Sequence, residues 1–127
     1  MKKELEKKLI DEFPTFFKDI YGDPRVTCMA FGCEIGDGWF DLIYDTCKKI
    51  APLDTEKKFH FLQVKEKFGG LRLYCAGGSR EIYDITSQAE DGSYKICEHC
   101  GSKEEVTSEG SWITTLCKTC RETPQSF

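Results

Sequence analysis

The sequence predicts an α+β fold, in which amphipathic helices pack on a small antiparallel sheet and a small cysteine-rich unit follows. Three observations predict it. Apolar residues recur every three or four positions in three segments, which is the period of helices that bury one face. Apolar and charged residues alternate over residues 59–76, which is the period of paired strands. Four of the eight cysteines lie within residues 97–120.

The length of the chain limits how many units it can form. With 127 residues, it can build one hydrophobic core and a small attached unit, but not two independent hydrophobic domains. We therefore expect a main domain at residues 1–91, the cysteine-rich unit at 92–121 and a flexible tail at 122–127.

The first helical segment opens the chain. We expect a helix at about residues 2–13, because Pro14 removes an internal hydrogen bond, and a second short helix or a kinked continuation to about residue 20. The next apolar run, at 26–35, is interrupted by Gly32 and favours a strand or an extended segment. The apolar positions that share one face of the helical segment are Leu5, Leu9, Phe13, Phe16, Phe17 and Ile20.

Two further helices are expected. Apolar residues return to helical spacing at about 38–50, and Asp37 can accept hydrogen bonds from the first free N–H groups of that helix. Another helix is expected to run from its cap, Ser79, to about residue 90. The residues expected to form the core between helices and sheet are Phe13, Phe16, Phe17, Trp39, Phe40, Ile43, Val64, Leu71 and Leu73.

The alternating segment predicts a β-hairpin with a two-residue loop at Gly69-Gly70. One strand face is then apolar and the other gathers cations. Opposed like charges on one sheet face are unfavourable unless an anion or an acidic partner lies over them. The pairs that this loop implies are Phe68 with Leu71, Lys67 with Arg72, and Lys65 with Tyr74.

This cationic face has two interpretations. A solvated strand face is the ordinary one, since charge on an exposed strand is common. The other is an anion site, in which an arginine contacts phosphate in a bidentate manner, lysines act as point charges and an aromatic ring stacks on a base. The residues predicted to bind the ligand are Lys65, Lys67, Arg72, Tyr74, Trp39 and Asp37.

The cysteine-rich unit has the spacing of a metal site. Two C-x-x-C pairs are separated by sixteen residues, which allows two knuckles to deliver four thiolates to one tetrahedral ion. The spacing predicts a zinc ribbon with one structural Zn²⁺ per chain, because four thiolates leave no coordination position for substrate. Two disulfides or four buried thiols are the alternative. The predicted ligands are Cys97, Cys100, Cys117 and Cys120.

Other reactive side chains have ordinary explanations. Glu34, Asp37 and Asp41 could form a divalent-metal or hydrolase site, but helix capping and the helix dipole explain the two aspartates. His60 is expected to pack within a strand, and His99 to point out of its knuckle. No catalytic signature is present, so we expect no enzyme. The spacing of the other cysteines contains no knuckle and favours burial for Cys28, Cys33, Cys47 and Cys75.

Charge and hydropathy restrict the partners and the compartment. The net charge of -4 disfavours binding to duplex DNA. No apolar run has the length of a membrane span or the form of a signal peptide. We therefore expect an intracellular protein that does not enter a membrane. The sequence does not decide whether the chain forms a homo-oligomer.

Four segments carry a resemblance to known proteins. They are the segment Cys28–Ile43 (CMAFGCEIGDGWFDLI), the hairpin segment Gln63–Tyr74 (QVKEKFGGLRLY), the acidic helix after Ser79, and the two cysteine knuckles. In these segments the chain resembles small proteins encoded by bacteriophages and prophages. The resemblance implies an accessory protein of the counter-defence type in bacterial cytoplasm, and it transfers no catalytic residue.

Two functions follow as expectations. The first is a non-enzymatic binder that captures a small anionic ligand, such as a nucleotide immune messenger, on the cationic hairpin face. The alternative is an interaction module whose zinc ribbon binds and inhibits a host defence protein or a nucleic acid.

Overall fold

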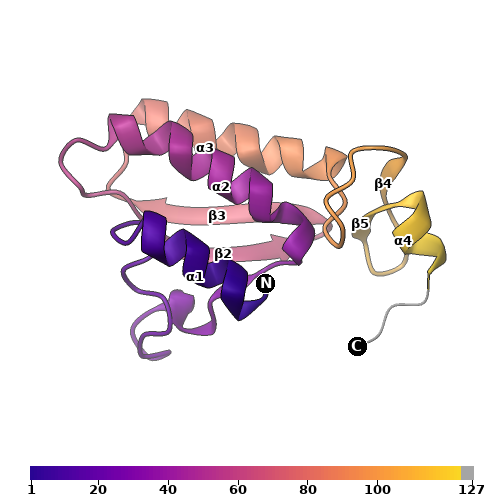
Figure 1. Cartoon of the computed structure of the whole chain (residues 1–127), viewed down its shortest axis with the longest axis horizontal. Helices are drawn as coiled ribbons and strands as arrows, with labels where there is room; N and C mark the ends of the chain where they lie inside the picture. The colour runs from indigo at the N-terminus through magenta and orange to yellow at the C-terminus, as the bar shows by residue number, and fades with distance from the viewer. Residues whose placement is uncertain (124–127) are drawn as a thin grey trace.

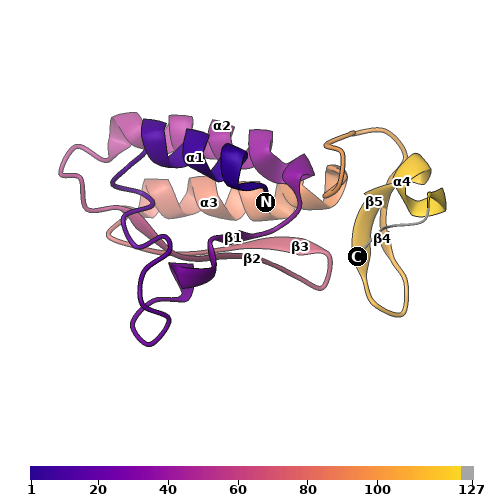
Figure 2. The same cartoon turned by 60° about the horizontal axis from the view of Figure 1, so that its bottom comes forward.

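The computed structural model describes residues 1–123, and it confirms the α+β class (Figure 1). Three helices lie on one side of a three-stranded sheet, and a ribbon unit stands at one end of this body (Figure 2). The helices of the body are α1 (Lys3–Glu12), α2 (Phe40–Ile50) and α3 (Arg80–Gly92), and its strands are β1 (Cys33–Glu34), β2 (His60–Lys67) and β3 (Gly70–Ala76). The ribbon unit contains β4 (Val106–Glu109), β5 (Thr114–Cys117) and α4 (Lys118–Glu122).

Four single turns of 3-10 helix join these elements: η1 (Cys28–Phe31), η2 (Asp37–Trp39), η3 (Ala51–Leu53) and η4 (Ser93–Lys95). The predicted flexible tail begins at Glu122, which is the last residue of α4, and its residues 124–127 lie outside the described residues. No helix in the described part of the chain combines the length and the apolar character needed to cross a membrane.

Two predictions for the N-terminal third are wrong. The expected second helix is absent, because residues 14–21 form consecutive turns after Pro14. The expected extended run at 26–35 contains only the two residues of β1, preceded by η1. Both segments instead follow the surface of the helix–sheet body, so their apolar residues reach the core from turns.

A buried carboxylate holds the second of these segments in place. Glu6 of α1 is only 3% exposed, and it accepts hydrogen bonds from the Cys33 N–H at 2.6 Å and from the Tyr21 hydroxyl. Gly32 has a φ of 73°, and a Cβ at this position would lie 2.5 Å from the Glu6 carboxylate. Burial, together with the Glu6 charge, raises the pKa of the Cys33 thiol to about 12. This contact fixes β1 against α1.

The hairpin loop lies one residue earlier than predicted, so each cross-strand partner shifts by two residues. Lys67 pairs with Gly70, so the loop is Phe68-Gly69, and both loop residues have positive φ (54° and 82°), as a type I′ turn requires. Gly70 is needed within β3, because a Cβ there would lie 2.2 Å from the Tyr94 hydroxyl. The corrected pairs are Lys65 with Arg72 and Gln63 with Tyr74. A shift of two residues keeps the three cations on one face and the apolar residues on the other, where Glu66 is the charged exception.

The outer edge of β3 is covered by side chains at the end of α3. The Leu71 N–H donates to the Ser93 hydroxyl at 3.0 Å, and the Leu73 N–H donates to the Glu90 carboxylate at 2.8 Å. At the opposite side of the sheet, β2 pairs in parallel with β1. The sheet is therefore held between α3 and the segment that α1 anchors.

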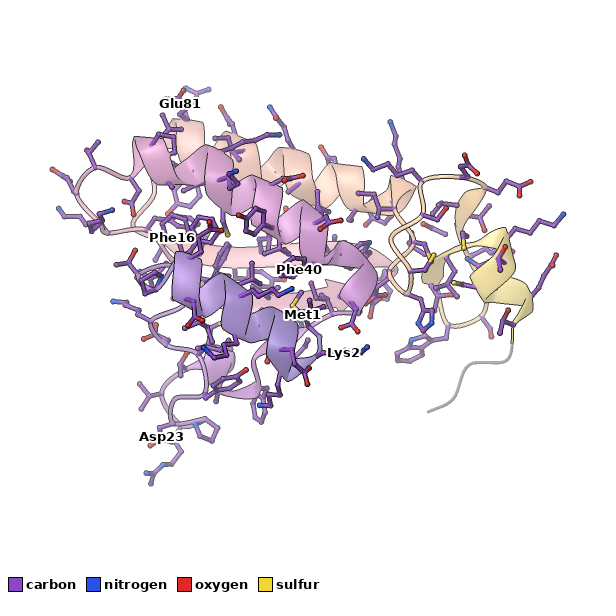
Figure 3. The ribbon with its side chains drawn as sticks, in the orientation of Figure 1. Met1, Lys2, Phe16, Asp23, Phe40 and Glu81 are labelled. Carbon is purple, nitrogen blue, oxygen red and sulfur yellow. The ribbon has the colours of Figure 1, made fainter. Side chains whose placement is uncertain are left out.

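The core lies between the helices and the sheet. Eight of the nine predicted core residues are buried, and Phe40 is the exception. Phe40 lies over a groove of about 530 Å³ that it lines with residues of α1 (Figure 3). The core residues beyond these nine are Leu9, Met29, Cys33, Ile35, Cys47, Ile50, Phe59, Phe61, Ile82 and Ala89.

Candidate metal centre and basic sheet face

The four ribbon cysteines converge as predicted. Their sulfur atoms all lie within 4.8 Å of one another, and Cys100 Sγ is 3.7 Å from Cys117 Sγ. A tetrahedral ion with metal–sulfur bonds of about 2.3 Å separates its sulfurs by roughly 3.8 Å. Figure 3 shows sulfur atoms gathered in the ribbon unit. The geometry of Cys97, Cys100, Cys117 and Cys120 therefore fits a four-thiolate metal centre.

Backbone N–H groups point at two of these sulfur atoms. The Cys100 N–H donates to Cys97 Sγ at 3.5 Å, and the Cys120 N–H donates to Cys117 Sγ at 3.4 Å. Burial opposes ionisation of Cys97, but N–H groups directed at its sulfur outweigh burial and lower its pKa to about 7. His99 is exposed between the two thiols of the first knuckle, as predicted.

The two knuckles of the ribbon are built differently from each other. The first knuckle is a loop, in which the Gly101 N–H donates to the Cys97 carbonyl at 2.9 Å. The second knuckle joins the end of β5 to the start of α4, and only β4 and β5 form a hairpin. One strand pair is enough, because the main domain supports the first knuckle from outside.

The Gly36–Trp39 segment provides that support. The Gly38 N–H donates to the Glu98 carbonyl at 2.8 Å, and the Gly36 N–H donates to the Glu98 carboxylate at 2.9 Å. The Trp39 ring N–H donates to the Ile96 carbonyl at 2.8 Å. This Gly-Asp-Gly-Trp motif is therefore a docking element for the metal knuckle.

Two of the predicted ligand-binding residues belong to this docking element. Trp39 is fully buried, so the prediction that its ring stacks on a ligand is wrong. Asp37 accepts the Lys2 N–H at 2.8 Å, which joins η2 to the N-terminal end of α1, so the prediction that Asp37 caps the helix at 38–50 is wrong. The Trp39 indole is needed to reach the Ile96 carbonyl. Because the ring is buried there, it is not available on the surface that was predicted to bind the ligand.

Gly38→Ala is expected to destabilise the protein by about 1 to 3 kcal/mol, because the new methyl group has no space. A Cβ at this position would lie 2.2 Å from the Cys97 carbonyl oxygen and 2.6 Å from the Gly101 nitrogen. Gly92→Ala is the matched control, since nothing lies within 4 Å of its added Cβ and the residue is helical. Chemical denaturation should show loss for the first variant and a small gain for the second. Equal stability of both variants would contradict the docking contact.

A second contact joins the hairpin loop to the ribbon. Thr115 of β5, which is fully buried, donates its hydroxyl to the Gly69 carbonyl and also bonds the Ser108 hydroxyl at 2.6 Å. A Cβ on Gly69 would lie 3.0 Å from Ile113 Cγ2. The hairpin loop and the ribbon hairpin therefore lie side by side, as both cartoon views show (Figures 1 and 2).

The sheet face away from the helices carries the predicted cations. The register places Lys65 beside Arg72, with Lys67 and Tyr74 two residue pairs away in opposite directions. We call these four residues the basic sheet face. No carboxylate of a described residue lies within ion-pair distance of its three cations. Glu34 of β1 pairs with Lys65 in the register and places a carboxylate beside this cation along the sheet.

Arg72 is held in position. Its guanidinium donates to the Tyr94 hydroxyl at 3.2 Å and to the Leu71 carbonyl at 3.0 Å. The hydrogen bond with Tyr94 raises the pKa of Arg72 above its usual value, so the side chain stays charged. Gly70 leaves the space in which the guanidinium and the Tyr94 ring meet. Arg72 is therefore pre-oriented at the edge of the face.

The remaining reactive side chains do not assemble into a site. Glu34 and Asp41 are exposed on different elements. His60 makes its ring contact with the Lys58 carbonyl at 3.0 Å. Among the described residues the only metal-binding cluster is that of the ribbon. The prediction that the other four cysteines are buried holds for Cys33 and Cys47, while Cys75 is half-buried and Cys28 is exposed.

Three aromatic residues on the hairpin loop and on the segments packed against it were not predicted from the sequence. Tyr94 orients Arg72, Phe68 stands in the hairpin loop with 66% of its surface exposed, and Trp112 is 81% exposed on the ribbon hairpin. The position of Phe68 would have followed from the correct loop. The available signal for Trp112 was a tryptophan two residues after Gly110, in a turn.

No family model, no curated protein and no solved structure matches the chain.

Proposed function

We propose that the protein is a zinc-stabilised, non-enzymatic binder that captures a phosphate-bearing ligand of the nucleotide type on the basic sheet face. The observation that carries the proposal is the row of three cations that no described carboxylate neutralises. Adjacent cations repel one another, and a bound phosphate offsets that repulsion.

Zinc is the proposed metal. Four thiolates in a tetrahedral arrangement suit zinc or an iron centre, and a ribbon with two C-x-x-C knuckles is a common structural zinc unit. The four cysteines would fill every coordination position, so the ion would stabilise the ribbon and support the first knuckle. In this proposal the metal takes no part in ligand binding.

The basic sheet face contains suitable groups for a nucleotide. Arg72 presents a planar, oriented donor set for phosphate oxygens, and the lysines supply charge without fixed geometry. Tyr74 is 44% exposed and offers a ring for stacking. With the resemblance to phage accessory proteins, such a binder would act by sequestering a nucleotide signal in a bacterial host.

Arg72→Ala is expected to weaken nucleotide binding by about 2 to 3 kcal/mol through loss of charge-assisted hydrogen bonds. Glu34→Gln is expected to strengthen binding roughly twofold, because it removes the carboxylate next to Lys65. Lys49→Ala is the matched control, since Lys49 is an exposed cation on α2, on the opposite side of the sheet. Calorimetry with linear and cyclic nucleotides measures all three.

The three variants separate an anion site from a solvated strand face. An anion site requires opposite effects of the Arg72 and Glu34 substitutions and no effect of the Lys49 substitution. Absence of heat with every nucleotide would exclude the proposed function, and an equal loss with Lys49→Ala would show a diffuse charge effect.

A further inference from the structure

We infer that the ligand of this face is a single-stranded nucleic acid, whose chain runs from the basic sheet face across the Phe68-Gly69 loop to the tip of the ribbon hairpin. The inference rests on the proposed function and names its ligand class. Three features of the surface support this ligand class: its exposed aromatic rings, their closeness to the cations, and its open shape.

The first step is the exposure of large rings. Trp112 and Phe68 expose 81% and 66% of their surfaces, and Tyr74 exposes 44%. Contiguous exposure of large apolar side chains is unusual on a protein surface and marks an interaction site. Flat rings beside cations are the arrangement with which proteins stack the bases of a single strand, because every base has a π-face.

The second step is continuity between the sheet and the ribbon. The Thr115–Gly69 hydrogen bond and the Ile113 contact hold the two hairpin tips together. Both tips lie toward the side of the sheet that the helices leave uncovered (Figure 2). Lys67 Nζ lies 5.6 Å from the centroid of the Phe68 ring, so a phosphate contact and a stacking contact are neighbours. Phe68 thus adjoins the basic sheet face, and the ribbon hairpin that carries Trp112 packs against the same loop.

The third step is shape. Three cavities of about 420, 530 and 390 Å³ lie elsewhere, and none is lined by a residue of the basic sheet face or by Phe68 or Trp112. Small ligands bind in concave pockets that bury most of their surface. An open surface suits an extended chain, which gains affinity by adding contacts along its length.

Charge and base access select a single strand over a duplex. A duplex keeps its base faces stacked inside, where exposed rings do not reach them. The net charge of -4 also disfavours the long phosphate tracks of duplex DNA. Three cations suffice for a few phosphates of a flexible strand, and they predict a slope of log affinity against log salt of roughly -2.

The test is a fluorescence titration of the intact protein with dodecathymidylate, with thymidine monophosphate and with a duplex of twelve base pairs. Trp112 is exposed while Trp39 is fully buried, so quenching of tryptophan emission reports stacking on Trp112. The single strand is expected to bind at least 10-fold more tightly than the monophosphate and to quench the emission.

Substitutions of Trp112 test whether its ring contributes to binding of the single strand. Trp112→Ala should weaken dodecathymidylate binding about 10-fold, and Trp112→Tyr should restore most of it, because a ring is again available. The control is Tyr83→Ala, which removes a partly exposed ring from α3, in the helix layer. Thermal melting of each variant shows that the fold is retained.

The outcomes distinguish this inference from the proposed function. Equal affinities for dodecathymidylate and the monophosphate, both lowered by Arg72→Ala and with unchanged emission, would overturn the inference and leave the proposed function standing. Tighter binding of the duplex would also overturn the inference. Absence of binding by all three probes would overturn both and favour a protein partner for the ribbon tip.

Discussion

Cys117→Ser is expected to unfold the ribbon unit and to loosen the main domain at two places. Three remaining thiolates bind metal far more weakly, and metal binding in small zinc units contributes about 10 to 16 kcal/mol to folding. The first knuckle holds Glu98 against Gly36 and Gly38, and β5 holds Thr115 against Gly69. Hydrogen exchange should therefore accelerate at the amides of Gly36 and Gly38, outside the ribbon itself.

The control for this result is Cys28→Ser. Cys28 is an exposed free thiol outside the metal cluster, so its replacement should leave metal content and exchange rates unchanged. Native mass spectrometry of the unmodified protein should show one zinc ion per chain, and a chelator should reproduce the effect of Cys117→Ser. Protection at Gly36 and Gly38 that survives metal removal would show that the main domain holds this segment alone.

Trp39→Ala is expected to cost about 3 to 5 kcal/mol of folding free energy. The side chain is fully buried, and its ring N–H satisfies the Ile96 carbonyl just before the first knuckle. The substitution removes the largest fully buried side chain in the described core and leaves that carbonyl without its donor. Urea denaturation measures the loss.

Phe40→Ala is the matched comparison at the neighbouring position. Its ring is half-buried over a groove, so less apolar surface is lost and the expected cost is about half that of Trp39→Ala. A larger loss for Phe40→Ala than for Trp39→Ala would mean that α2 presents a different face to the core.

These two residues illustrate what helical spacing can and cannot predict. The spacing predicted α2 and its apolar stripe, and Ile43, Cys47 and Ile50 are fully buried as that stripe requires. The same spacing marks both Trp39 and Phe40 as apolar, and it does not reveal which is covered. The ribbon decides this, because the carbonyl that binds the Trp39 indole belongs to a segment 57 residues away.

The metal centre and the hairpin register show the same division. Ligand spacing within a knuckle is local, so four cysteines were enough to predict the cluster. The hairpin segment contains two adjacent glycines, Gly69 and Gly70, and its loop could have been either Gly69-Gly70 or Phe68-Gly69. The choice depends on Tyr94, which needs the space at Gly70, and on Thr115, which contacts Gly69. Such contacts between distant segments carry no signal in the local pattern.

The cations on the sheet face were predictable because alternation assigns them to one side in either register. Their surroundings were not. Phe68 occupies the hairpin loop with a positive φ, a conformation that a phenylalanine disfavours. Trp112 belongs to the ribbon hairpin. Trp112 lies near the hairpin loop only because the ribbon packs beside that loop.

The covered edge of β3 has a consequence for self-association. An exposed strand edge recruits strands from other molecules, and this is a common start of aggregation. A strand approaching β3 would find the N–H groups of Leu71 and Leu73 already engaged by Ser93 and Glu90. It would have to displace the end of α3 before it could pair. A crowded solution of this protein is therefore protected against growth of the sheet from one molecule into the next along β3.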